Sequence, residues 1–164
     1  MVSCDHGDMG CNGGWLNNAW EYLVDFGVVS DSCFPYTAGS GKAPACVTGC
    51  ANADPFTKYK CKAGSIVEAT NPAQIKTEIY ANGPMETGFT VYNDFFNYKG
   101  GIYRHTSGGM AGGHAVKILG WGVEGGVNYW ICANSWGAAW GENGFFRIAF
   151  GQCGIDAGVY ACIP

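Results

Sequence analysis

Charged residues are scarce in this sequence of 164 residues. Lys, Arg, Asp and Glu together make up 13% of it, against about 25% in an average globular chain. The lysines and arginines form no cluster, and the formal net charge is −4. Because a nucleic-acid-binding domain needs a basic patch to neutralise phosphates, this composition predicts no nucleic-acid partner.

Long apolar runs are absent as well. No stretch approaches the roughly 20 consecutive apolar residues that cross a bilayer. The N-terminus shows no basic segment followed by a short apolar one, so no signal peptide is expected in this sequence. We therefore predict no membrane association. The sequence has no internal repeat, and its length suits one domain that buries a hydrophobic core.

Histidine is rare, with three residues, whereas cysteine is abundant, with nine. Zinc sites typically combine closely spaced pairs of ligands. The sequence has no two Cys-x-x-Cys pairs. Cys4, His6 and Cys11 are the alternative set of metal ligands, but their spacing is poor. We therefore predict no metal and no cofactor. Disulfides persist in oxidising compartments, so the cysteine content favours the secretory pathway, with a lysosomal, vacuolar or extracellular destination.

Two segments show the periodicity of helices. Residues 15–26 carry an apolar face, and Gly27 stands where a helix C-cap is expected. That face consists of Leu16, Ala19, Trp20, Leu23 and Val24. Residues 71–84 begin with an asparagine at the N-cap position and a proline in the first turn, and they end with a Gly-Pro pair. In this second helix we expect Ile75 and Ile79 to face inward.

The remaining chain divides into a loop-rich part and a β-rich part. Residues 30–64 hold four cysteines and three prolines without periodicity, which indicates a long loop held by cross-links. The later residues are rich in aromatic and β-branched side chains and are broken by glycines, as in a small barrel or curled sheet. Candidate strands are Met85–Tyr92, Gly101–Tyr103, His114–Gly122, Val127–Ala133, Gly144–Phe150 and Val159–Ile163. We predict an α+β fold that is helical and loop-rich over about 1–60 and β-rich over about 61–164.

Two segments of the β-rich part carry polar residues suited to catalysis. In GGHAVKILGWG (112–122) His114 begins an apolar strand, and in YWICANSWGAAWGENGFF (129–146) Asn134 follows another one. If the two strands are neighbours, the amide of Asn134 can hold the imidazole of His114 in one tautomer. A purely structural hydrogen bond between a histidine and a turn asparagine is the alternative.

These segments resemble the papain-like cysteine proteases, and cathepsin B-like members in particular. GGHAV (112–116) is similar to the histidine motif of that family, and NSWGAAWGENGFF (134–146) is similar to its asparagine motif. CNGG (11–14) and NGPMETGFTVYNDFFNYKGGIYRH (82–105) match two further motifs, and GWGVE (120–124) looks most like cathepsin B. The resemblance covers nearly the whole chain. It implies a papain-like fold with a near-complete, β-barrel-like right domain and an incomplete helical left domain.

The resemblance implies a cysteine-type endopeptidase with His114 and Asn134 as catalytic residues. Trp136 would shield their hydrogen bond and line the leaving-group side. In this family the nucleophilic cysteine directly precedes a tryptophan, but the residue before the first tryptophan here is Gly14, so Cys11 is not the nucleophile. Cys11 precedes His114 by 103 residues, whereas the family spacing is about 130–150. We therefore expect the nucleophile to lie outside this sequence and the chain alone to be inactive.

The resemblance also assigns a substrate groove. Gly13 and Gly14 on one wall and Gly113 on the other would expose backbone to an extended peptide. Gly88 and Gly158 would line the pocket for the second residue before the scissile bond. Cathepsin B carries a glutamate at the position of Gly158, which accepts arginine, so a glycine there predicts a preference for bulky apolar side chains. The implied partners are peptide or protein substrates and cystatin-like inhibitors, and the implied state is a monomer.

The cysteines and the long loop follow the same resemblance. It implies disulfides between Cys4 and Cys46 and between Cys33 and Cys50, and it suggests one between Cys61 and Cys162. Cys11 would pair outside the chain, and Cys132 and Cys153 would be buried, inert thiols. The segment FPYTAGSGKAPACVTG (34–49) is short and lacks the histidine pair that caps the groove of cathepsin B, which implies an open groove and endopeptidase action.

Two other functions stay open on the sequence. A pseudoprotease would use the groove to bind peptides or inhibitors without catalysis. A disulfide-rich secreted interaction module would share only the fold. The retention of His114, Asn134 and Trp136 favours the protease, because a protein without catalysis is free to lose them. If the family's central helix is absent, apolar surface in the helical part would be left exposed.

Overall fold

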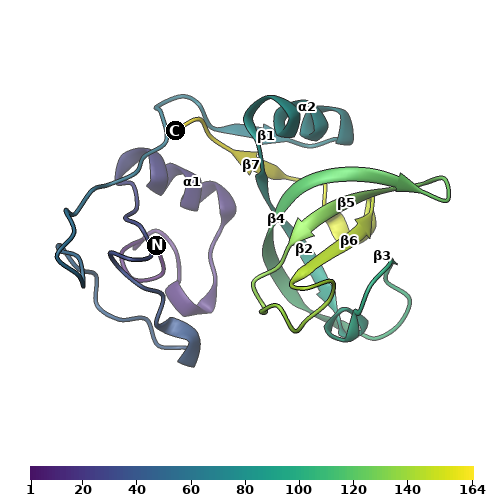
Figure 1. The fold of residues 1–164 in the computed structure, drawn as a ribbon, viewed down its shortest axis with the longest axis horizontal. Coiled ribbons are helices and arrows are strands. Elements are labelled where there is room, and N and C mark those ends of the chain that lie inside the picture. Colours follow the sequence, from purple (N-terminus) through teal and green to yellow (C-terminus); the bar gives the residue numbers. More distant parts are fainter. The chain divides into compact units, whose positions relative to one another are not determined.

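The computed structural model describes residues 1–164 and contains two compact units. The first unit consists of Met1–Ile66 together with Cys162–Pro164, and the second is Val67–Ala161 (Figure 1). The first holds one α-helix and irregular chain, and the second holds a seven-stranded sheet with one α-helix. No helix has the length and apolar composition that crossing a bilayer requires.

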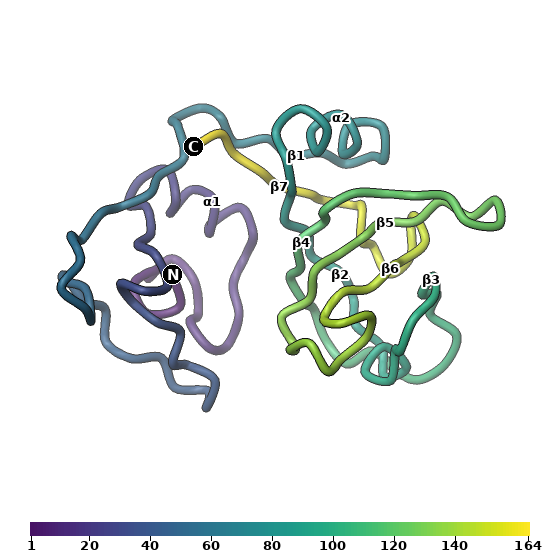
Figure 2. The backbone as a smooth tube through the Cα atoms, in the orientation of Figure 1, coloured from purple at the N-terminus to yellow at the C-terminus, as the bar shows by residue number.

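The first unit is built around α1 (Leu16–Asp25), as the periodicity predicts. The helix ends where Gly27 adopts a φ of 70° and its N–H donates to the carbonyl oxygen of Tyr22 over 3.1 Å. Two short 3₁₀ helices, η1 (Gly10–Asn12) and η2 (Ala38–Ser40), are the other regular elements of this unit. Between α1 and β1 (Val67–Ala69) the backbone follows a long irregular path (Figure 2).

Three disulfides cross-link the chain. They join Cys4 to Cys46, Cys33 to Cys50 and Cys61 to Cys162. All three pairs agree with those that the family resemblance implies. Cys4, one of the three residues of the poorly spaced alternative metal site, is bonded to Cys46 and so is not available as a metal ligand.

The first unit has little hydrophobic core. Its only buried hydrophobic residues are Cys33, Ala38 and Cys61. The apolar face of α1 is half-buried, and no residue of this helix is fully buried. The side chain of Trp15, just before the helix, is 69% exposed. This agrees with the expectation that apolar surface is left uncovered here.

The second unit is an almost entirely antiparallel sheet with the strand order β1-β7-β2-β4-β5-β6-β3. Its other strands are β2 (Met85–Tyr92), β3 (Ile102–Tyr103), β4 (Met110–Glu124), β5 (Val127–Ala133), β6 (Phe145–Ala149) and β7 (Val159–Ala161). Only β3 and β6 pair in parallel. The bounds predicted for β2 and β5 are confirmed. No strand is predicted at Val67–Ala69, where the structure has β1. β4 begins four residues earlier than expected because Met110, Gly112 and Gly113 pair with the end of β2.

One hydrophobic cluster fills the second unit. Its largest fully buried side chains include Trp130, Phe95, Phe146 and Ile118. Ile75 and Ile79 of α2 (Pro72–Asn82) join the cluster, as predicted. The N-cap of α2 is also confirmed, because the side chain of its asparagine accepts a hydrogen bond from the N–H of Gln74 over 3.1 Å.

A carboxylate organises the turn after the short helix η3 (Asn93–Asn97). Asp94 accepts hydrogen bonds from the hydroxyl of Tyr103 (2.6 Å) and the N–H groups of Thr106 (2.9 Å) and Ser107 (3.2 Å). Its two oxygens also lie 3.2 Å from Nδ1 of His105. Partial burial opposes ionisation of Asp94, but these hydrogen bonds outweigh it and hold the pKa of the carboxyl well below its ordinary value.

Replacing Asp94 with asparagine is expected to destabilise the protein by about 1–3 kcal/mol at pH 7, because an amide serves these donors less well than a carboxylate. Since the folded pKa of Asp94 is depressed, its stabilisation is complete at neutral pH and is lost as pH falls below about 4. The measurement is urea unfolding of both proteins between pH 7 and pH 2. The difference in unfolding free energy should shrink in acid. Asp25→Asn, an exposed position, should show no such trend, and a difference for Asp94→Asn that is constant with pH would contradict the assignment.

Candidate functional site

The candidate site lies where β4 and β5 run side by side. His114 lies within β4, and Asn134 immediately follows β5, whose last residue Ala133 pairs with Lys117 of β4. Nε2 of His114 lies 2.8 Å from Oδ1 of Asn134. The strand pairing thus joins two side chains that are 20 residues apart in the sequence.

The hydrogen bonds of Asn134 determine the tautomer of His114. Oδ1 of Asn134 also accepts the backbone N–H of Ser135 over 2.8 Å, and this fixed donor sets the orientation of the amide. An amide oxygen only accepts hydrogen bonds, so Nε2 of the neutral imidazole must carry the proton. Nδ1 then presents its lone pair on the other side of the ring. Asn134 thus fixes both the tautomer and the orientation of the His114 ring.

An aromatic wall covers the ring of His114. Trp136 stacks on it with ring centroids 5.0 Å apart and planes 25° from parallel. Trp136 also contacts Phe95 and stacks on Phe96, at centroid distances of 5.5 and 5.3 Å. A large flat apolar ring excludes water from a neighbouring hydrogen bond, which strengthens the electrostatic attraction in it. The position of Trp136 is therefore compatible with the shielding role that the sequence suggests.

The loop that carries Asn134 and Trp136 is closed on itself. The N–H of Asn134 donates to the carbonyl oxygen of Gly144 over 2.9 Å, and the N–H of Gly144 donates to that of Trp140 over 2.8 Å. The indole N–H of Trp140 reaches the carbonyl oxygen of Phe96 at 3.2 Å. These bonds fix the loop at both ends, so the position of Asn134 does not depend on its side chain alone.

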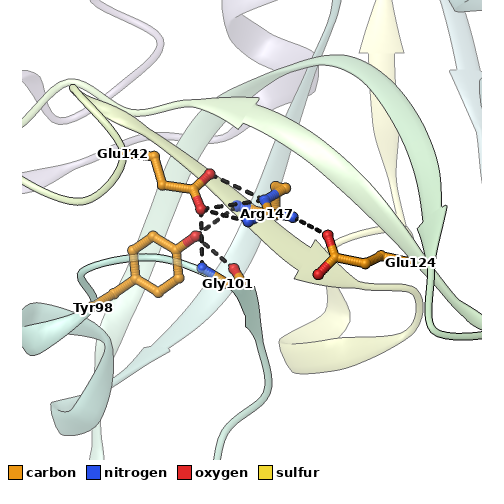
Figure 3. A network of polar contacts seen from close by, with 5 residues as sticks. All are labelled: Tyr98, Gly101, Glu124, Glu142 and Arg147. Carbon is orange, nitrogen blue, oxygen red and sulfur yellow. Dashed lines mark hydrogen bonds and ion pairs between the residues drawn. The ribbon is translucent and has the colours of Figure 1, made fainter.

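A polar network on β6 holds the far end of this loop (Figure 3). The guanidinium of Arg147 donates to both oxygens of Glu142, with Nη2 to Oε1 at 2.8 Å, and Nη1 donates to Glu124 at 2.6 Å. Glu142 also accepts the N–H of Gly101 over 2.9 Å, and Tyr98 donates its hydroxyl to the carbonyl oxygen of Gly101 over 2.6 Å. The bonds from Arg147 lower the pKa of the Glu142 carboxyl and raise that of the guanidinium. None of these residues is predicted from the sequence to have a role in the site.

The glycines assigned to substrate binding lie in both units. Gly13 and Gly14 are exposed residues of the first unit, and Gly13 has a φ of 105° that favours glycine. A Cβ built at Gly14 would lie 2.6 Å from the side chain of Asp8, so a larger residue here would require Asp8 to move. Gly113 is exposed on β4, with no atom within 4 Å of a Cβ built there. Gly88 lies on β2 and pairs with Ala115 of β4, the residue that follows His114.

Three cysteines of the chain are free, and they differ in their burial. Cys11 is exposed, Cys132 is fully buried in β5, and Cys153 is half-buried rather than buried as expected. Burial raises the pKa of the thiols of Cys132 and Cys153, which disfavours the nucleophilic thiolate. Of the three free thiols, two are therefore in surroundings that disfavour the thiolate, and the third is exposed.

The sequence of this chain matches a known protein family. The profile of the papain family cysteine proteases (Peptidase_C1) matches residues 1–163. The chain belongs to the papain family. The fold is the papain-like fold, with mixed helices and sheet.

Cathepsin B-like members of the papain family are the similar relatives. The chain is 45% identical over 161 residues to "Cathepsin B-like CP3" of Giardia intestinalis, covering 95% of the chain and 54% of that protein. It is 41% identical over 194 residues to "Cathepsin B-like cysteine proteinase 4" of Caenorhabditis elegans, covering 100% of the chain and 58% of that protein. Procathepsin B S9 of Trypanosoma congolense has a similar structure, with a TM-score of 0.91 and 36% identity over 99% of this chain and 58% of that one. The chain thus spans little more than half the length of the relatives it matches.

Proposed function

We propose that this chain contributes the histidine and asparagine of a papain-family cysteine endopeptidase that works in the secretory pathway, a lysosome-like compartment or the extracellular space. The observation that carries the proposal is the 2.8 Å contact between Nε2 of His114 and Oδ1 of Asn134, under the stacked ring of Trp136. Membership of the papain family and the three disulfides support it.

In this proposal His114 acts as the general base and acid. Its Nδ1 accepts the proton of a cysteine thiol, and the imidazolium that forms later donates that proton to the leaving amine. Asn134 holds Nε2–H, so that the ring keeps one orientation through both steps. In the second half of the reaction Nδ1 accepts a proton from the water that hydrolyses the acyl-enzyme. Trp136 keeps the bond between His114 and Asn134 dry.

The substrate would lie as an extended peptide against bare backbone. Gly113 of the second unit is exposed and has no side chain, so an extended peptide can meet its backbone through main-chain hydrogen bonds. Gly13 and Gly14 offer the same feature within the first unit. The segment 34–49 carries no histidine that could bind the carboxylate of a peptide end. We therefore propose cleavage inside peptide chains rather than removal of dipeptides, with cystatin-like proteins as inhibitors.

The test is to assay two preparations with an internally quenched peptide, with and without a cysteine-reactive epoxide. We expect the 164-residue chain to show no turnover above the buffer rate, because none of its free cysteines takes the place of the nucleophile. We expect the native protein, isolated from its source and characterised by intact mass and N-terminal sequence, to hydrolyse the peptide and to be blocked by the epoxide.

The outcomes separate the competing functions. Epoxide-sensitive turnover by the 164-residue chain would show that one of its own cysteines acts as the nucleophile. If the native protein contains no further cysteine and is inactive, the proposal of catalysis is overturned and the chain acts as a pseudoprotease. His114→Ala in the active native protein should lower kcat by several orders of magnitude, since it removes a member of the catalytic set.

A further inference from the structure

The loop that carries Asn134 ends in a tight turn at Asn143 and Gly144. These two residues have positive φ values of 57° and 90°. Glu142 and Phe145 close the turn by exchanging backbone hydrogen bonds of 2.9 and 3.1 Å. The carbonyl oxygen of Gly144 in turn accepts the N–H of Asn134 over 2.9 Å. The backbone of Glu142 is therefore linked to that of Asn134 through a single turn.

The side chain of Glu142 ties this turn to two other segments (Figure 3). Its Oε1 accepts the backbone N–H of Gly101, 41 residues away in the sequence, over 2.9 Å. Nε and Nη2 of Arg147, on β6, donate to the same carboxylate at 3.1 and 2.8 Å. The hydroxyl of Tyr98 accepts the backbone N–H of Arg147 over 3.1 Å and donates to the carbonyl oxygen of Gly101 over 2.6 Å. The four residues thus form a closed ring of hydrogen bonds.

The segments joined by this ring are those that meet at His114. Gly101 belongs to the turn after η3, and Phe96 of η3 stacks on Trp136. Trp136 lies two residues after Asn134 and stacks on the imidazole of His114. A movement of the loop against the turn after η3 would therefore displace the amide of Asn134 and the covering indole together.

A carboxylate at position 142 is what the closed ring requires. Glu142 receives three N–H donors, two from Arg147 and one from Gly101. A glutamine would turn its own N–H₂ group toward one of these donors, because only one of its two polar atoms accepts. The side chains of Glu142 and Arg147 are 30% and 24% exposed, so their attraction is partly shielded from water. Glu124 binds the same guanidinium at 2.6 Å but is 64% exposed, and exposed pairs contribute little.

We propose that Glu142 is a positioning residue, which keeps the amide of Asn134 on the ring of His114 by fixing the loop 134–144 to the turn after η3. The inference rests on the proposed function, because it assumes that the histidine takes part in catalysis. Glu142 acts through the backbone and not by contact with the reacting atoms. A displacement of about 1 Å at a catalytic group costs up to about 100-fold in rate, so a carboxylate outside the site is able to govern turnover.

The first test is proton NMR of the 164-residue chain and its Glu142→Gln variant. The signal to follow is Nε2–H of His114, whose exchange with water reports how well its bond to Asn134 is formed and covered. We expect Glu142→Gln to accelerate this exchange about tenfold. Glu124→Gln is the matched control, because it removes the same charge from the same guanidinium outside the loop. It should leave the exchange rate unchanged within about twofold.

The second test is kinetic and uses the native protein. Glu142→Gln should lower kcat about tenfold and change KM by less than about twofold, because misplacing a catalytic group weakens the transition state and not substrate binding. Glu124→Gln should leave both constants unchanged. Arg147→Lys retains the positive charge but loses the fork of donors, so it should cause smaller changes than Glu142→Gln in both tests.

Each result has a distinct meaning. Unchanged exchange in Glu142→Gln, or equal acceleration by Glu124→Gln, would overturn the inference and leave the proposed peptidase function intact. Lower stability in urea with normal exchange and normal kcat would also overturn it, since Glu142 then has a structural role alone. If Glu142→Gln does not fold, Arg147→Lys decides, and wild-type exchange in that variant would overturn the inference. If the wild-type native protein hydrolyses no peptide, the proposed function fails, and the role of Glu142 in the reaction fails with it.

Discussion

Replacing Phe95 with alanine is expected to lower the free energy of unfolding by about 3–5 kcal/mol, the usual cost of deleting a fully buried aromatic ring. Phe95 is 0% exposed, although it lies in the short helix η3 and not in a strand. Its ring contacts six other aromatic rings, those of Phe89, Tyr98, Tyr103, Trp136, Trp140 and Phe146. Deleting it leaves a cavity that several rigid rings cannot collapse to fill.

Urea unfolding followed by intrinsic fluorescence measures this effect. Tyr80→Ala is the matched control, because Tyr80 lies on α2 and is 89% exposed. That change should alter the unfolding free energy by no more than about 0.5 kcal/mol. Similar losses for both variants would mean that the aromatic cluster does not carry the stability of the second unit. Since Phe95 supports Trp136, the Phe95 variant should also broaden or shift the NMR signals of His114.

Removing the disulfide between Cys61 and Cys162 is expected to cost about 4–5 kcal/mol in the double variant Cys61→Ser/Cys162→Ser. The two cysteines are 101 residues apart, and the closed loop contains the whole second unit. A cross-link over a long loop restricts the unfolded chain strongly, so its removal favours the unfolded state. Unfolding in urea without reducing agent gives the difference directly.

The disulfide between Cys33 and Cys50 is the matched control for loop length. Its separation is 17 residues, which predicts a smaller loss of about 3 kcal/mol for Cys33→Ser/Cys50→Ser. If the short loop costs as much as the long one or more, the chain-entropy explanation is wrong for this protein. In that case the disulfides act through the native state, for example by fixing the irregular segment between α1 and β1.

The regular elements were predictable where local signals agree. The helix α2 has an asparagine cap, a proline in its first turn and a Gly-Pro end, so its bounds follow from residues next to one another in the sequence. The strands β2 and β5 alternate buried and less buried side chains, which a period of two reveals. In contrast, β1 has only three residues, too few for any period to be visible, and it forms because β7 pairs with it.

By itself the sequence determined the elements with strong local patterns, and it singled out His114 and Asn134 as candidates because each adjoins a readable apolar run. Only the tertiary structure decided which distant side chains meet. Glu68 and Tyr160 are 92 residues apart, and Gly101 and Glu142 are 41 apart, yet each pair shares a hydrogen bond. Such contacts arise from strand register and loop closure, which depend on the packing of the whole unit, so no local pattern of residue types encodes them.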